Sequence, residues 1–211
     1  MQLLSSHKAS KFLNLSSPSK SALRNINFKM AQCSLKASST DVPEGLSDGC
    51  KGAPALPGAK LPLPGTEEIM RAKAHGTTDK PVQENLRWNC DRKVADKICS
   101  FNRHYAEYGG YWLTTTFLKE ARGTEVTFYD SVTGRPLFIA PRGRSWEDFE
   151  AESRSHGWPS FRDQEVVWDD VRVLPDGEAV SLAGTHLGHN LPDRKGNRYC
   201  INLVSVAGSP Q

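Results

Sequence analysis

The sequence contains no run of about 18 consecutive apolar residues, roughly the length that crosses a bilayer as a helix. We therefore expect no membrane-spanning helix and no membrane partner. The five cysteines form no C-x-x-C pair, and an odd number of cysteines is a poor basis for a disulfide framework. A four-cysteine zinc site cannot be read from this pattern, whereas thiol chemistry in a reducing compartment stays open.

Residues 1–40 contain no acidic side chain, although they carry six Lys or Arg and ten Ser. This composition is typical of a mitochondrial or chloroplast transit peptide. The large share of serine favours the plastid, with the mitochondrion as the alternative. The apolar patches are too short for the core of a secretory signal, which needs about 7–15 residues. We expect residues 1–40 to be a removable transit peptide.

The rest of the chain has no excess of positive charge. Residues 41–211 carry 21 basic and 24 acidic side chains, a net charge of −3, whereas the whole chain has +3. A nucleic-acid-binding domain more usually presents a clustered basic face, so we expect no nucleic-acid partner. Hydrophobic residues make up 37% and charged residues 24%, and 211 residues fit one globular domain with appendages.

Proline and glycine are concentrated after the predicted transit peptide. Residues 41–65 contain five Pro and five Gly and show no periodicity. Ordering them would cost backbone entropy without burying much apolar surface. We therefore expect a Pro/Gly-rich linker over residues 41–85 and a folded domain over residues 86–211.

Apolar residues recur at helical spacing within residues 86–108. They follow one another at intervals of four, three and four, which places them on one face of a helix. The members of this stripe are Val94, Ile98, Phe101 and Tyr105. Cys90 lies one turn earlier on the same stripe, whereas Cys99 falls on the opposite face. The pair Gly109-Gly110 is expected to end this N-terminal helix.

After Gly123 the pattern changes to short runs rich in β-branched and aromatic residues, separated by turn signals. These runs are Glu125–Asp130, Pro136–Ala140, Val166–Leu174, Glu178–Leu182 and Tyr199–Val206. One amphipathic helix interrupts them, with Ser145 and Asp148 spaced as in a capping box. We therefore predict a mainly β fold of antiparallel strands, with an N-terminal helix and one short helix before the GWPSF turn that ends at Phe161.

Chemistry can be read from the segment RYCIN at Arg198–Asn202. Residues two apart in a strand face the same side, so Arg198, Cys200 and Asn202 are expected to project together. The thiolate is the reactive form of cysteine, and a neighbouring guanidinium favours it. Cys200 is therefore the candidate nucleophile.

Two further motifs supply polar and apolar partners for such a thiol. In HLGHNLPD, His186 and His189 are expected to lie on a short loop containing Gly188 and to donate protons, since histidine titrates near neutral pH. Asp193 is expected to orient one imidazole. In HGWPSF, Trp158 offers a flat apolar wall for a substrate methyl group.

In this order, the three motifs closely resemble the methionine sulfoxide reductase B (SelR) family, over roughly Glu125–Gly208. The resemblance implies an MsrB-like β fold and a peptide-methionine (R)-S-oxide reductase that acts in protein repair under oxidative stress. Its partners would be oxidised proteins carrying methionine-R-sulfoxide and thioredoxin or a similar thiol donor. It implies no cofactor.

The resemblance also implies a role for each site residue. Cys200 would attack the sulfoxide and become a sulfenic acid, as the first step of cysteine oxidation. The polar pocket would comprise His186, His189 and Asp193, the activators of the thiolate would be Arg198 and Asn202, and the substrate-binding residues would be Trp158 and Phe161.

The sequence departs from the family pattern in three places. Many members bind zinc through two C-x-x-C pairs, but the matching positions here are Asp130, Thr133, Val180 and Ala183, so we predict no metal. The common resolving-cysteine position is Ser155, so resolution would fall to Cys90, to Cys99 or to an external thiol. Cys99 is favoured because it lies off the apolar stripe. The usual HLGHVF reads HLGHNL, with Asn190 and Leu191.

An alternative function stays open on these departures. Without zinc and without the usual resolving thiol, the chain could be a catalytically weak MsrB-like module that binds oxidised proteins or senses oxidants. The complete set of Cys, His, His, Asp, Arg and Asn favours the enzyme.

Overall fold

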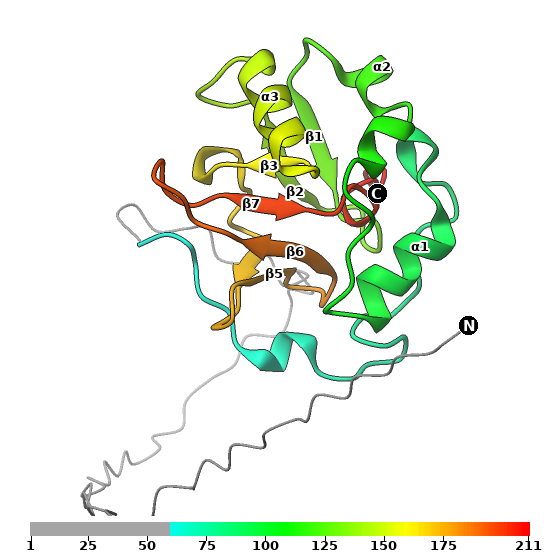
Figure 1. Ribbon diagram of the computed structural model, residues 1–211. Coiled ribbons are helices and arrows are strands. Elements are labelled where there is room, and N and C mark those ends of the chain that lie inside the picture. The colour runs from blue at the N-terminus through cyan, green and yellow to red at the C-terminus, as the bar shows by residue number, and fades with distance from the viewer. Residues whose placement is uncertain (1–59) are drawn as a thin grey trace, which may run out of the picture. The chain divides into compact units, whose positions relative to one another are not determined.

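Antiparallel strands make up most of the regular structure after residue 125, in a computed structural model that describes residues 60–211 (Figure 1). One sheet has five strands in the order β3–β7–β6–β5–β4, and β1 pairs with β2 in a separate ribbon. The strands are β1 (Val126–Tyr129), β2 (Pro136–Ala140), β3 (Ser160–Phe161), β4 (Val171–Val173), β5 (Glu178–Ser181), β6 (His186–Asn190) and β7 (Tyr199–Ile201). Every pairing between these strands is antiparallel, so the predicted fold class is confirmed.

Helices are short and lie mostly before the sheet in the chain. The α-helices are α1 (Arg92–Asp96), α2 (Phe117–Ala121) and α3 (Trp146–His156). A π-helical turn spans Lys97–Phe101, and 3-10 helices span Glu67–Met70, Arg87–Asn89, Tyr111–Thr114, Asp163–Glu165 and Leu203–Ser205. Within residues 60–211, none of the helices is long and apolar enough to cross a membrane.

Helix α3 forms where the capping signal predicts it. The side chain of Ser145 accepts the backbone N–H of Asp148 at 3.1 Å, which satisfies one of the unpaired donors of the first turn. The helix ends at Gly157, whose φ of 87° is strained for residues with a side chain. The chain then turns directly into β3, which brings Trp158 next to the sheet.

The N-terminal helix is much shorter than predicted. Trp88 and Asn89 have φ values of 60° and 57°, which a right-handed helix does not allow. Helix α1 starts only after Asp91, whose carboxylate caps it, and the helical turns end at Phe101. Gly109-Gly110 therefore does not end this helix, because the chain has already left the helical conformation.

The HLGH segment is a strand, β6, and the prediction of a loop was wrong. It pairs with β5 on one side and with β7 on the other (Figure 1). Gly188 allows the close approach of β6 to β7, since a Cβ there would lie 2.0 Å from the carbonyl oxygen of Cys200. Its φ of 155° also favours glycine, because residues with a side chain rarely adopt this backbone conformation.

Residues 60–85 belong to the folded unit, so a linker up to residue 85 is too long. The backbone of Gly65 and of Leu63 exchanges hydrogen bonds with Val173 in β4, at 2.8 and 2.9 Å. Met70 and Val82 are buried. Pairing with an edge strand and burial of apolar side chains offset the entropy cost on which the linker prediction rested. The predicted transit peptide 1–40 and residues 41–59 lie outside the described residues.

A cluster of phenylalanines forms the centre of the core between the ribbon, α3 and the sheet. Its fully buried members are Phe117, Phe128, Phe138, Phe149 and Phe161. Phe161 stacks on Phe138 with ring centroids 4.3 Å apart and packs edge-on against Phe128. The predicted substrate-binding role of Phe161 was wrong, because this ring faces the core and lines no part of the cavity that contains Cys200.

We predict that Phe161→Ala lowers the free energy of unfolding by about 3–5 kcal/mol, since it removes a fully buried ring and leaves a cavity. Urea denaturation followed by circular dichroism measures this change. Phe101→Ala is the matched control: that ring is 57% exposed, and its loss should cost less than about 1 kcal/mol. Equal costs for both variants would contradict the packing described here.

Candidate active site

A cavity of about 410 Å³ lies over β6 and β7 and contains Cys200 in its wall. The turn after α3 and the segment 104–106 supply its other walls. Six of the residues singled out in the sequence line it: Cys200, His186, His189, Arg198, Asn202 and Trp158. The structure thus gathers a thiol, two imidazoles, a guanidinium, an amide and an indole around one space.

Cys200 lies in the middle of the sheet and is half-buried. On strand β7 it stands opposite Ser160 of β3 and opposite His189 of β6. Nη1 of Arg198 donates a hydrogen bond to its Sγ at 2.7 Å, and the hydroxyl of Ser160 lies 3.8 Å from the same sulfur. A guanidinium in direct contact stabilises a negative charge on sulfur, so the predicted pairing of Arg198 with the thiol is present.

His186 is buried and bonded to a carboxylate that sequence reasoning missed. Its Nδ1 lies 2.7 Å from Oε1 of Glu178, which is equally buried. Arg103 donates to the other carboxylate oxygen of Glu178 at 2.6 and 2.9 Å. Burial alone would raise the pKa of Glu178, but the hydrogen bonds from His186 and Arg103 outweigh it and lower that pKa. An ionised Glu178 accepts the Nδ1 proton and fixes the orientation of the ring.

His189 packs edge-on against His186, with ring centroids 5.9 Å apart. Burial lowers the pKa of His189 below its usual 6.5, and the neighbouring His186 lowers it further. His189 is therefore neutral at pH 7 and faces the cavity beside Cys200.

Asp193 does not reach either imidazole, so its predicted role as their orienting group was wrong. Its two oxygens accept from Arg162 at 2.8 and 3.1 Å. Its Oδ2 also lies 3.5 Å from Nε of Arg198. The hydrogen bonds from Arg162, and then from the backbone of Lys195, lower the pKa of Asp193. The guanidinium of Arg198 thus lies between Asp193 and the thiol of Cys200.

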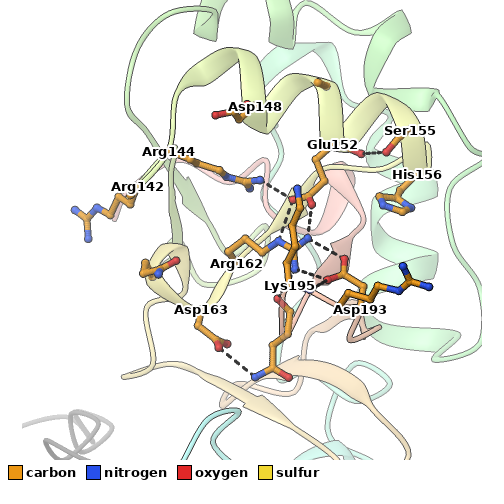
Figure 2. A pocket seen from close by; sticks show the side chains of 15 residues that line it. Arg142, Arg144, Asp148, Glu152, Ser155, His156, Arg162, Asp163, Asp193 and Lys195 are labelled. Carbon is orange, nitrogen blue, oxygen red and sulfur yellow. Dashed lines mark hydrogen bonds and ion pairs between the residues drawn. The ribbon is translucent and has the colours of Figure 1, made fainter.

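Figure 2 shows a second cavity, of about 800 Å³, whose walls are mainly charged. Arg162 lies between Glu152 and Asp193, and Glu152 also accepts from Arg144 at 2.6 Å. Its acidic and basic groups largely neutralise one another, and no thiol lines it. Ser155 lines this cavity and not the one that contains Cys200. The smaller cavity is thus the candidate active site.

Asn202 is held by backbone groups. Its Oδ1 accepts the N–H of Glu107 at 3.1 Å, and its Nδ2 donates to the carbonyl of Leu187 at 3.1 Å. Trp158 is also tied to Glu107, because its indole N–H donates to that residue's carbonyl at 3.0 Å. The predicted contact of Asn202 with the thiolate is not found among the residues that the structure describes; the amide shapes the cavity.

Both candidate resolving thiols are buried, and the inference that Cys99 is the less confined of the two was wrong. Cys99 is fully buried in the π-helical turn, and its thiol donates to the hydroxyl of Ser205 at 3.6 Å. Burial raises the pKa of Cys90 to about 12 and raises that of Cys99 as well. Neutral, buried thiols are poor nucleophiles toward a sulfenic acid.

The four positions that match zinc ligands in the resembling family form part of the core and its turns. Asp130 is fully buried and accepts from the backbone of Val132 at 2.8 Å and from the hydroxyl of Thr185 at 3.0 Å. Val180 and Ala183 carry no ligating side-chain atom. Across residues 60–211, no three His, Cys, Asp or Glu side chains are grouped to hold a metal ion.

The candidate site also contains Glu178, Arg103, Glu107 and His104, which lie outside the sequence motifs, and Ser160, which lies within HGWPSF but was not singled out. A glutamate inside a predicted strand is one signal that could have pointed to Glu178, since an unpaired buried carboxylate is costly. The others reach the site only through strand pairing and the course of the chain over residues 102–108.

Comparison with curated proteins finds a similarity over part of the chain. A peptide methionine sulfoxide reductase MsrB from Methanosarcina mazei is 41% identical to this chain over 61 residues, which cover 24% of the chain and 43% of that protein. The chain therefore spans less than half the length of the curated relative that it matches. No family model matches the chain, and no solved structure matches it.

We predict that His189 titrates below pH 6.5 in the folded protein, because burial disfavours the charged ring. The unfolded chain then binds more protons than the folded one just below the unfolded pKa. The contribution of His189 to the free energy of unfolding should accordingly fall as the pH is lowered from about 6.5 toward the folded pKa. A ¹H–¹⁵N NMR titration, assigned with His189→Asn, measures the midpoint. A midpoint at or above 6.5 would contradict the buried setting.

Proposed function

We propose that the protein is a peptide-methionine (R)-S-oxide reductase with Cys200 as its nucleophile. The observation that carries this proposal is the 2.7 Å hydrogen bond from Arg198 to Cys200 Sγ in a cavity that His186, His189 and Trp158 also line. The partial similarity to an MsrB protein supports the same chemistry. The activity, the choice of epimer and the partners are all part of the proposal.

The first step transfers oxygen from substrate sulfur to enzyme sulfur. The Cys200 thiolate attacks the sulfoxide sulfur and forms an S–S bond while the oxygen is protonated. The hydroxyl group then passes to Cys200 Sγ as the S–O bond of the substrate and the S–S bond both break, which leaves an electron pair on the methionine sulfur. The products are methionine, a thioether, and Cys200 sulfenic acid. No external oxidant or reductant is needed for this step, since the thiol is oxidised as the sulfoxide is reduced.

His186 is the proton donor in this proposal. Its Nδ1 is bonded to the buried carboxylate of Glu178, which fixes the orientation of the ring so that it can pass a proton to the substrate oxygen. His189 has a lowered pKa and is neutral at pH 7, which suits a ring that shapes the cavity or accepts a proton. The two histidines thus have different roles because only one of them has a carboxylate partner.

Trp158 provides the wall against which the substrate methyl group packs. The ring is half-buried, and the bond from its indole N–H to the carbonyl of Glu107 fixes its orientation. The exposed apolar side chains of Tyr105 and Leu191 extend this wall at the rim of the cavity. Such a surface favours a methyl sulfoxide on a polypeptide over a small polar ligand.

An external thiol reduces the sulfenic acid in the proposed cycle. A dithiol donor such as thioredoxin attacks Cys200 sulfenic acid, releases water and forms a mixed disulfide, and its second thiol then frees Cys200. The burial and raised pKa values of Cys90 and Cys99 support this route over resolution within residues 60–211. The reductant's two thiols supply both electrons.

Residues 1–40 lead us to propose that the protein acts in an organelle. Their basic, serine-rich and acid-free composition supports import into the plastid, with the mitochondrion as the alternative. There it would repair oxidised proteins that carry methionine-R-sulfoxide.

We predict that Cys200→Ser abolishes reduction of methionine-R-sulfoxide, because a serine hydroxyl is a far weaker nucleophile toward sulfur at neutral pH. The assay follows both epimers of a peptide-bound sulfoxide by chromatography, with unchanged circular dichroism as the control for folding. The wild type should reduce the R epimer and leave the S epimer intact. Activity above a few per cent in the variant, or no turnover by the wild type, would refute the proposed function.

We also predict that Cys90→Ala and Cys99→Ala both sustain thioredoxin-driven turnover, since neither buried thiol takes part. Mass spectrometry after one equivalent of substrate without reductant should find one added oxygen on Cys200 and no internal disulfide. If Cys99→Ala instead completes a single turnover and then stops, Cys99 resolves the sulfenic acid and the external-thiol route is wrong.

A further inference from the structure

Glu107 is a buried carboxylate next to the candidate active site, and the proposed reaction does not use it. The residue is 3% exposed. Its Oε1 accepts the backbone N–H of Leu203 at 2.8 Å, and its Oε2 accepts that of Val204 at 3.1 Å. These donors open the short 3-10 helix that follows β7. The side chain therefore anchors residue 107 to the turn that begins three residues after Cys200.

The backbone of Glu107 holds two walls of the cavity. Its N–H donates to the side-chain oxygen of Asn202 at 3.1 Å. Its carbonyl accepts the indole N–H of Trp158 at 3.0 Å. Because the side chain is anchored on one side and both peptide groups are engaged on the other, a shift of residue 107 moves Trp158 and Asn202 together.

No cation balances the charge of this carboxylate among the residues described. The titratable groups around it are the thiols of Cys90 and Cys99 and the phenol of Tyr111, all neutral at pH 7, while Lys93 and Lys97 share an open cavity with it. The Lys97 ammonium instead lies 4.4 Å from the ring centre of Tyr105.

Burial raises the pKa of Glu107 to about 7, although the two backbone hydrogen bonds oppose the rise. The carboxyl group therefore changes its charge close to neutral pH. When it is protonated, one oxygen becomes a donor, and it can no longer accept both N–H groups equally well.

We propose that Glu107 is a positioning residue that sets the geometry of the sulfoxide pocket through Trp158 and Asn202. The assignment of a sulfoxide as the substrate rests on the proposed function, whereas the anchoring of Trp158 and Asn202 by Glu107 does not. Ionised, Glu107 keeps both backbone bonds and holds the indole wall in place. Protonated, it loosens the turn after β7 and with it the wall, so substrate binding weakens as the pH falls through neutrality.

The first test uses NMR and needs no activity. The indole N–H resonance of Trp158, assigned by its absence in Trp158→Phe, should shift with a midpoint near pH 7 in the wild type. In Glu107→Gln it should show no such transition. A resonance that does not titrate in the wild type, or that titrates alike in both proteins, overturns the proposal.

The second test compares kinetics at two pH values. At pH 8, Glu107→Gln should raise KM for a peptide sulfoxide about five- to ten-fold with little change in kcat, the range expected for one lost hydrogen bond of ordinary strength. At pH 6 the KM values of the two proteins should differ less than about two-fold, because the carboxyl group of Glu107 in the wild type is then largely protonated. An equal difference at both pH values overturns the proposal.

Asp130→Asn is the matched control. Asp130 is also a fully buried carboxylate that accepts backbone N–H groups, but it does not line the cavity. This variant should lower the melting temperature and leave KM and its pH dependence unchanged. If the indole resonance of Trp158 shifts with pH as expected but neither the wild type nor the variants reduce a sulfoxide, the positioning role stands and the proposed reductase function fails.

Discussion

The close pairing of β6 with β7 is the constraint on which the candidate site depends. It requires glycine at position 188, where any side chain would collide with the carbonyl of Cys200. The resulting register sets His189 directly opposite Cys200, while pairing with β3 sets Ser160 on the other side. A register shift by one residue would turn the thiol to the opposite face of the sheet and separate it from the cavity.

The buried carboxylates of Glu178, Glu107 and Asp130 are satisfied in two different ways. Glu178 is bonded to Arg103 and His186, so its charge is balanced. Glu107 and Asp130 accept mainly neutral donors, and burial raises the pKa of both. Because an uncompensated buried charge is costly, the charged partners of Glu178 favour a carboxylate that stays ionised. The neutral donors around Glu107 instead allow its charge to change near neutral pH.

The three cysteines of the described residues lie in different environments. Cys200 is half-buried, lines a cavity and accepts a hydrogen bond from a guanidinium. Cys90 and Cys99 are buried among apolar side chains, where burial raises their pKa values and keeps the thiols neutral. Access and local charge, rather than the number of thiols, therefore favour a single reactive cysteine.

The sequence by itself determined the antiparallel β class, the position and cap of α3, and six of the residues that line the cavity, Cys200 among them, because these depend on local spacing and residue type. Helical spacing at Val94, Ile98, Phe101 and Tyr105 predicted too long a helix, since backbone conformation at Trp88 and the cap at Asp91 override periodicity. Only the tertiary structure decided that Phe161 belongs to the core and that Asp193 binds Arg162. It also decided that Glu178 is bonded to His186 and that the backbone of Glu107 is bonded to Asn202. These contacts join segments far apart in the chain, and strand register and burial, which no local pattern encodes, select them.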